Sequence, residues 1–239
     1  MKKVKRYAAL LLCAAVLLAA AGCSIFPTPG FAEYDVSGYV KALLDSSYHG
    51  DHDAIKEISG VDDAGAQANS DTTVENAAIY FCNNYGISPS DRQLDELKAI
   101  MRQAFALTKY TVKEERKVEG GYYLEVEVAA ITNFEGRSAD IDRLKIEAQD
   151  ATIGSSGNTP SSEGDDDGKD PASSAPQAGT DANSLFVDKV LEFCKSELAN
   201  ISYDPDTRSL PLDVIQTEKG ELQLDMNQLD AIDRAVIRF

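Results

Sequence analysis

Residues 119–129 of the chain read EGGYYLEVEVA. From Tyr122 onward apolar side chains alternate with more polar ones, which is typical of a β-strand with one buried face and one face in water. The glycines before Tyr122 favour a turn, and an upstream run from Tyr110 to Val118 also has a strand-like composition. The segment therefore predicts an antiparallel hairpin.

The length of the turn sets which residues face each other across this hairpin. A three-residue turn would pair Val112 with Val128 and Lys113 with Glu127. A two-residue turn shifts this register by one residue. The sequence leaves the two alternatives open.

A second hairpin is predicted near the carboxyl terminus. Apolar residues alternate over residues 210–215, Lys219-Gly220 can turn the chain, and Leu222 with Leu224 forms a short fourth strand. Because an isolated two-stranded hairpin is barely stable in water, we expect both hairpins to join in one small curved antiparallel sheet.

Helices are predicted on both sides of the first hairpin, because apolar residues recur there at helical spacing. The expected N-caps are Asp35, Asp71, Ser88 and Asp225, with Pro89 in the first turn after Ser88. Small and polar residues predict a loop at residues 60–70. The expected helices cover residues 36–48, 53–58, 72–85, 89–105, 138–151, 185–201 and 226–237.

These elements predict an α+β fold in one domain. Residues 154–183 are rich in Ser, Gly, Pro, Asp and Ala and hold no aliphatic side chain larger than alanine, so we expect a disordered acidic linker there. Residues 184–239 are few for an independent core. We therefore expect residues 33–153 and 184–239 to be two parts of the same domain, with the linker as an insertion.

The amino terminus has the layout of a secretory signal, since basic residues at positions 2–6 precede an apolar run from Tyr7 to Ala21. This run is short for a lasting membrane span. The residues at its end, Ala20-Ala21-Gly22-Cys23, resemble the lipobox of bacterial lipoproteins, with Ala20 where leucine is commoner.

The lipobox resemblance implies a signal peptide at residues 1–22, cleavage between Gly22 and Cys23, and diacylglycerol on the Cys23 sulfur. Two acyl chains anchor a protein stably where one does not. Residues 23–32 would form a lipidated tether. We therefore expect the chain at the extracytoplasmic face of the cell membrane.

Charge narrows the range of partners. The chain carries 23 basic and 40 acidic residues, a formal net charge of −17. This charge repels the phosphates of nucleic acids, so we expect no nucleic-acid partner. The expected partners are the membrane, through the lipid on Cys23, and an envelope protein or small ligand.

Cys82 and Cys194 remain after Cys13 and the lipidated Cys23 are set aside. An exported compartment permits a disulfide between them, which would close a loop of about 110 residues and stabilise by ~4–5 kcal/mol in the chain-entropy model. The alternative is two buried free thiols. The apolar stripes around both residues favour the thiols.

No motif in the sequence indicates a catalytic site or a cofactor. Residues 49–53, His-Gly-Asp-His-Asp, gather two imidazoles and two carboxylates, but a helix stop and a helix cap already explain Gly50 and Asp51, and we expect no metal site. Residues 163–168 are similar to a calcium loop, but Ser174 stands where the loop needs glutamate.

Several runs resemble a family of uncharacterised cell-surface lipoproteins of Gram-positive firmicutes. They are residues 39–45 with Tyr48 and Gly50-Asp51, residues 109–112, Gly120-Gly121-Tyr122, residues 200–203, and Gly220 with residues 229–233. Glu221-Leu222 departs from the aromatic residue that this family often carries after its last turn glycine. The resemblance implies helices on a curved sheet, as in the cystatin or nuclear-transport-factor folds, and it implies no reaction.

We expect a non-enzymatic module that binds a ligand or another envelope protein. The alternative is a small enzyme on the same fold that uses Asp or Glu for acid–base chemistry. A buried carboxylate facing a pocket would favour the enzyme, and an apolar or shallow pocket would favour binding. Four tyrosines, Tyr85, Tyr110, Tyr122 and Tyr123, could line such a pocket or belong to the core and its rim.

Overall fold

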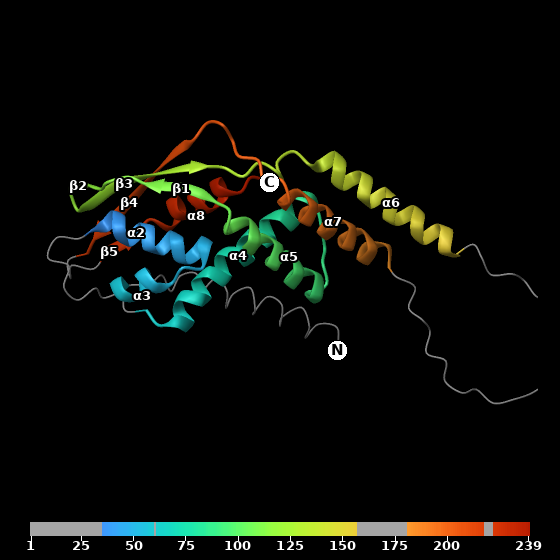
Figure 1. The fold of residues 1–239 in the computed structure, drawn as a ribbon, viewed down its shortest axis with the longest axis horizontal. Coiled ribbons are helices and arrows are strands. Elements are labelled where there is room, and N and C mark those ends of the chain that lie inside the picture. Colours follow the sequence, from blue (N-terminus) through green and yellow to red (C-terminus); the bar gives the residue numbers. More distant parts are fainter. Residues whose placement is uncertain (1–34, 60, 157–180, 218–221) are drawn as a thin grey trace, which may run out of the picture.

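The computed structural model describes residues 35–59, 61–156, 181–217 and 222–239, and it confirms the α+β architecture (Figure 1). Helices come first along the chain. They are α2 (Val36–Leu44), the π-helix η1 (Asp45–His49), α3 (Asp53–Ser59), α4 (Asp63–Tyr85) and α5 (Asp91–Phe105).

An antiparallel sheet follows in the order β1–β3–β4–β5, with β2 also paired to β3. The strands are β1 (Lys109–Val112), β2 (Arg116–Val118), β3 (Gly121–Ala129), β4 (Arg208–Gln216) and β5 (Leu222–Leu224). The central strand β3 pairs with β4 from Gly121 opposite Ile215 to Val128 opposite Arg208. The two predicted hairpins therefore join in one sheet, as expected.

One face of the sheet is buried. Leu124, Val126 and Val128 of β3 and Leu212 and Val214 of β4 are each at most 1% exposed. This face packs against α2 and the last helix, α8 (Met226–Val236), which lie on the same side of the sheet in Figure 1. The alternation of polar and apolar residues in the sequence correctly predicted this buried face.

The first hairpin has the two-residue turn, one of the two alternatives that the sequence left open. Val118 pairs with Gly121, which leaves the two-residue turn Glu119-Gly120. Gly120 has φ of 81°, a left-handed conformation that favours glycine.

Between β1 and β2 the chain leaves its hydrogen-bonded ladder with β3. The register of β1 against β3 is therefore shifted by one residue from the register of β2 against β3. Val112 therefore faces Val126. Lys113 still reaches Glu127 through a 2.8 Å ion pair. An unpaired residue of this kind increases the local twist of a sheet, and the turn alone could not predict it.

The start of α4 differs from the prediction of a loop at residues 60–70. The helix begins at Asp63 rather than after Asp71, because the Asp62 side chain accepts a 2.8 Å hydrogen bond from the N–H of Gly65. A segment of small polar residues has the composition that is typical of a loop. Here the Asp62 N-cap and the packing of the rest of α4 keep this segment helical.

The start of α5 was predicted two residues too early. Ser90 is the N-cap instead of Ser88. Gln93 explains the difference, because its side chain accepts a 3.0 Å hydrogen bond from the N–H of Ser90 and completes a capping box. The predicted caps Asp35 and Asp225 are confirmed for α2 and α8.

Two long helices shorten the predicted linker at both ends. α6 (Ser138–Ser156) and α7 (Ala182–Leu198) pack against each other, and α7 packs on α5. In Figure 1, α6 and α7 extend away from the sheet together. The remainder of the predicted linker, the Lys219-Gly220 turn, the signal peptide and the tether lie outside the described residues.

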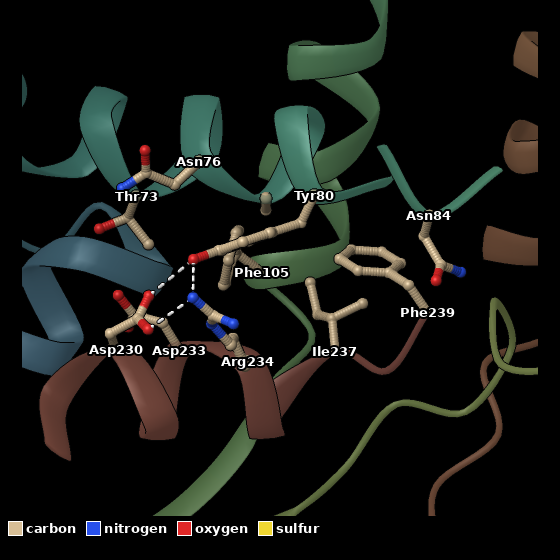
Figure 2. Close-up of a pocket in the computed structure, with 11 residues that line it drawn as sticks. Thr73, Asn76, Tyr80, Asn84, Phe105, Asp230, Asp233, Arg234, Ile237 and Phe239 are labelled. Atoms are coloured by element: carbon tan, nitrogen blue, oxygen red, sulfur yellow. Dashed lines mark hydrogen bonds and ion pairs between the residues drawn. The ribbon is translucent and has the colours of Figure 1, made fainter. Parts of the chain in front are cut away.

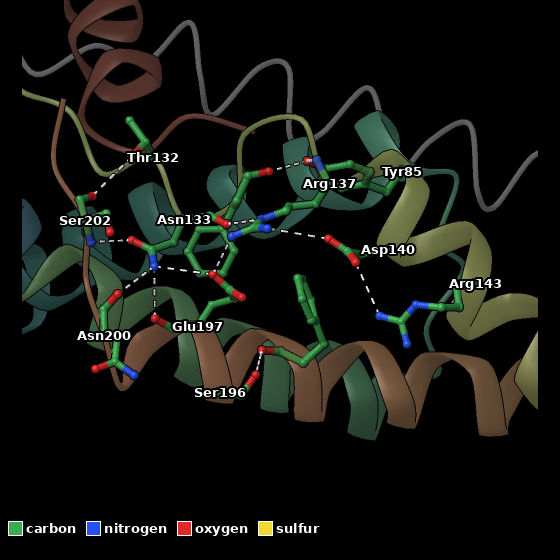
Figure 3. A network of polar contacts seen from close by, with 12 residues as sticks. Tyr85, Thr132, Asn133, Arg137, Asp140, Arg143, Ser196, Glu197, Asn200 and Ser202 are labelled. Atoms are coloured by element: carbon green, nitrogen blue, oxygen red, sulfur yellow. Dashed lines mark hydrogen bonds and ion pairs between the residues drawn. The ribbon is translucent and has the colours of Figure 1, made fainter.

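Asn133 joins the connection after β3 to the segment after α7 (Figure 3). Its Nδ2 donates to the carbonyls of Glu197 and Asn200 at 3.1 and 2.9 Å, and its Oδ1 accepts from the N–H of Ser202 at 2.7 Å. The residue is 5% exposed. One side chain thus satisfies three backbone groups of the other part of the chain.

A backbone bridge next to Asn133 fixes the carboxyl terminus. The N–H of Ile131 donates to the carbonyl of Val236 at 2.9 Å, and the N–H of Arg238 donates to the carbonyl of Ile131 at 2.9 Å. The residues after α8 therefore have a defined position beside the end of β3.

We predict that Asn133→Ala lowers the free energy of unfolding by about 2–4 kcal/mol, because it leaves buried backbone groups without hydrogen bonds. The matched control is Asn200→Ala, which removes an exposed side chain and keeps the carbonyl, and should change stability by less than about 0.5 kcal/mol. Urea denaturation followed by circular dichroism measures both. Equal effects would contradict the role assigned to the Asn133 amide.

Candidate functional site

A cavity of about 290 Å³ lies between α4 and α8 (Figure 2). α5 and the carboxyl-terminal residues complete its wall. The lining residues are Thr73, Asn76, Ala77, Tyr80 and Asn84 of α4, Phe105 of α5, and Asp230, Asp233, Arg234, Ile237 and Phe239 at the carboxyl terminus.

Helical spacing places these side chains on facing surfaces. The α4 residues recur at intervals of three and four, which puts them along one side of that helix. On α8, Asp230, Asp233 and Arg234 have the same spacing and face α4. The cavity is therefore bounded by segments that lie far apart in the sequence.

The floor of the cavity is apolar. Phe105 and Ile237 are each 1% exposed, and Ala77 is buried as well. Phe239 packs edge-on against Phe81, with ring centroids 5.6 Å apart. A ligand in the cavity would therefore bury its apolar part against two aromatic rings and an isoleucine.

A closed polar triad forms the rim (Figure 2). The Tyr80 hydroxyl donates to Asp230 at 3.1 Å, and Arg234 pairs with Asp230 at 2.8 Å. Arg234 also donates to the Tyr80 hydroxyl and lies over its ring, 4.2 Å from the centroid. Asp230 and Arg234 therefore neutralise each other at the surface.

Asp233 occupies a different environment from Asp230. The buried Tyr48 hydroxyl donates to its Oδ1 at 2.5 Å. Burial raises the pKa of Asp233 to about 6, against the opposing effect of the Tyr48 hydrogen bond, and the charge of Asp230 raises it further. The carboxylate is thus held in a place that disfavours its charge.

The π-helix η1 positions Tyr48. Its ring stacks on Phe105 with centroids 5.2 Å apart, and its hydroxyl reaches α8. The π-helix ends at Gly50, whose φ of 69° stops it. Short π-helical turns often occur at functional sites because they reorient side chains that a regular helix would point elsewhere.

The two histidines of residues 49–53 are directed to different partners. His49 lies 3.3 Å from the carbonyl of Thr108, while His52 lies 2.8 Å from the hydroxyl of Ser46. Within the described residues, no group of three or more His, Cys, Asp or Glu side chains is placed to hold a metal ion. Residues 163–168 lie outside the described residues.

The four tyrosines named from the sequence do not share a pocket. Tyr85 donates to the carbonyl of Phe134, and Tyr110 donates to Asp45. Tyr123 donates to Glu125 at 2.8 Å on the outer face of the sheet, and Tyr122 packs against the core. Tyr85, Tyr110 and Tyr122 therefore pack beside the core, whereas Tyr123 lines a separate pocket on the outer face with Arg116 and Glu125.

Cys82 on α4 and Cys194 on α7 are buried and are free thiols in the structure. Burial raises the pKa of Cys194 to about 12, and the charge of Glu197 adds to this effect. Burial also raises the pKa of Cys82. Both thiols therefore stay protonated at neutral pH, which makes them poor nucleophiles.

The sequence reasoning missed the cavity residues, yet α8 carried a signal for one of them. Leu229, Ile232 and Val236 define an apolar stripe, and Asp233 falls inside it at a spacing of four from Leu229. An acid within an apolar stripe marks a local inconsistency that often accompanies function. Tyr80 had no comparable signal, because an exposed-side tyrosine on a helix is common.

Within the described residues, no helix combines the length and the apolar character needed to cross a membrane. Cys23 and Gly22 lie outside those residues, so lipidation and cleavage there stay predictions.

We predict that Asp233→Asn stabilises the protein at neutral pH. An unfolded aspartate titrates near pH 3.8 and the native Asp233 near about 6. Protonated Asp233 therefore makes its full favourable contribution to stability below about pH 4. As pH rises through about 6 this contribution is lost, and the free energy of unfolding falls by at most ~3 kcal/mol. The variant should be more stable than the native protein at about pH 7.5 and lose this advantage below about pH 4.

Urea titrations at several pH values measure the difference in unfolding free energy. The control is Asp142→Asn on the exposed side of α6, which should change stability little. A difference for Asp233→Asn that does not vary with pH would contradict the raised pKa.

Comparisons with known proteins concern the fold. No protein-family model and no curated protein matches the sequence. The structure is similar to the crystal structure of "a putative lipoprotein (ycdA) from Bacillus subtilis", with a TM-score of 0.54 and 13% sequence identity over 86% of this chain. The match covers 56% of that chain, so this chain spans little more than half its length. The chain therefore shares a fold with a protein described as a lipoprotein.

Proposed function

We propose that the protein is a lipid-anchored binding protein at the extracytoplasmic face of the cell membrane, and that the cavity between α4 and α8 is its ligand site. The lipobox-like residues 20–23 and the likeness in fold to a described lipoprotein support the anchor. The lipid on Cys23 would hold the folded part near the membrane through the short tether of residues 23–32.

One observation supports the cavity as the binding site. The cavity combines an apolar floor with a destabilised carboxylate at Asp233 and a rim whose charges are already paired. Ligand sites are usually concave and mostly apolar, with a few polar groups that fix orientation. This cavity has that composition.

An enzyme is the second candidate, and Asp233 is the observation in its favour. A carboxyl group with a pKa near about 6 is suited to acid–base catalysis, and it faces the cavity. Binding is the better supported reading because the described residues that line the cavity include no Ser, Cys, His or Lys beside Asp233. The other carboxylate of the lining, Asp230, is paired with Arg234 and accepts a hydrogen bond from Tyr80, so it is poorly placed to act as a second acid or base.

We predict that Cys23→Ala moves the protein out of the detergent phase or leaves its signal uncleaved, because the acyl chains are lost. The matched control, Cys13→Ala, changes a cysteine within the predicted signal and should leave partitioning unchanged. Phase partitioning and the intact mass of the purified protein measure both. A native chain that still begins at Met1 would contradict the anchor.

We predict that a tryptophan at the cavity rim reports ligand binding. The chain has no tryptophan, so Asn76→Trp introduces a unique fluorophore beside the cavity. Its emission should shift when small amphipathic compounds are added at up to millimolar concentration, because the indole leaves water.

The control is Ile79→Trp, on the same helix at a position that is 43% exposed and outside the lining. Its emission should not change. A compound library that shifts neither variant, or shifts both equally, would overturn the cavity as a ligand site. Chemical turnover of a bound compound that is lost in Asp233→Asn would favour the enzyme instead.

A further inference from the structure

We propose that the cavity binds a small primary amine, with its ammonium group at Asp233 and its apolar body over Phe105 and Phe239. This inference rests on the proposed function and adds the chemical class of the ligand.

The cavity has an excess of negative charge. Its charged lining residues are Asp230, Asp233 and Arg234. Arg234 already pairs with Asp230 at 2.8 Å and lies over Tyr80. Ionised Asp233 is then left without a cation among the lining residues. A cationic ligand would supply the missing charge, and an anionic ligand would meet repulsion.

The hydrogen bonding of Asp233 leaves acceptor capacity for such a ligand. Its bond from Tyr48 uses Oδ1. An ionised carboxylate can accept about four hydrogen bonds over its two oxygens. Tyr48 is buried at 2% exposure, so it supports the carboxylate from the protein side while the cavity lies on the other. An ammonium group has three donors to offer at that position.

The layout of the cavity separates a polar end from an apolar end. Figure 2 shows Asp230 and Asp233 at one end and Ile237 and Phe239 toward the other, with the uncharged amide of Asn84 beyond Phe239. A ligand with an ammonium group at one end and a ring or alkyl chain at the other matches this arrangement. Polyamines with charge at both ends would place one charge against the apolar floor.

The volume limits the ligand to a small molecule. About 290 Å³ corresponds to roughly ten water-sized groups at ~30 Å³ each. Phenethylamine, a ring with a two-carbon arm and an amine, has this size and shape. 2-Phenylethanol is its neutral counterpart, and 3-phenylpropanoate is its anionic counterpart.

Asp233 is the group whose titration should control binding. The groups that face it are Tyr48 from η1, Tyr80 from α4, and Asp230 and Arg234 on its own helix. Burial raises the pKa of both tyrosines, so they stay protonated. The pKa of Asp233 lies near about 6, so the carboxylate is mostly ionised at pH 7.5 and mostly neutral at pH 5.

The test is a ligand-observed NMR titration of the full mature chain in detergent, with empty micelles as the blank. Phenethylamine should bind more tightly than 2-phenylethanol at pH 7.5 and lose about tenfold in affinity at pH 5, as the carboxylate takes up a proton. The neutral alcohol should show no such loss. 3-Phenylpropanoate should bind most weakly at pH 7.5.

Two variants separate the roles of the two acids. Asp233→Asn should reduce the affinity for phenethylamine to that of the alcohol at both pH values. Asp230→Asn should lower it by less than about threefold, because Asp230 is already neutralised by Arg234. The unfolding curves of both variants verify that they are folded.

Equal affinities for amine and alcohol, or an amine affinity that does not depend on pH, would overturn the amine class. If another compound still shifts the Asn76→Trp emission, the cavity remains a ligand site and the proposed function stands. If no compound shifts that emission and phenethylamine does not bind, both proposals fail.

Discussion

The pairing of β3 with β4 is the constraint on which the remaining structure depends. β3 precedes residues 157–180 and β4 follows them, and the two strands pair over eight residue positions in the middle of the sheet. Asn133 and the backbone of Ile131 continue the same junction beyond the end of β3. Because these contacts are buried and satisfied, the segment from α7 to β4 cannot be displaced without exposing unpaired backbone groups. The position of α8, and with it the position of the cavity, follows from this junction.

The cavity exists because three differently oriented elements meet without filling the space between them. α4 runs from α3 toward α5, α8 lies under the sheet, and the last residues are held beside β3 by the Ile131 bridge (Figure 1). Tyr48 supports two of the lining residues, since its ring stacks on Phe105 and its hydroxyl donates to Asp233. A regular helix at η1 would rotate the following side chains, and Asp233 would then lack its one buried partner.

The sequence predicted those features that depend on local periodicity. It predicted the buried face of β3, the strands of the second hairpin and the caps at Asp35 and Asp225. Each of these features depends on neighbours within a few residues. The offset of β1 could not be predicted from the sequence, since it depends on where the chain leaves the ladder before β2. The cavity could not be predicted either, because its walls come from residues more than 140 positions apart, as in the Tyr80–Asp230 contact. Periodicity contains no information about which stripes face each other.

Asp233 shows why such a site can be recognised only when the sequence and the structure are considered together. Within the sequence it is an acid in an apolar stripe, which is more often a solvated edge of the stripe than a site. Within the structure the same residue is a carboxylate held against a buried tyrosine at a cost to stability, while the nearby Asp230 is fully paired. A protein under selection for stability alone would gain from an amide or an apolar residue at this position. The ligand that we propose for this cavity would offset that cost, because a cation beside the carboxylate restores a favourable environment for its charge.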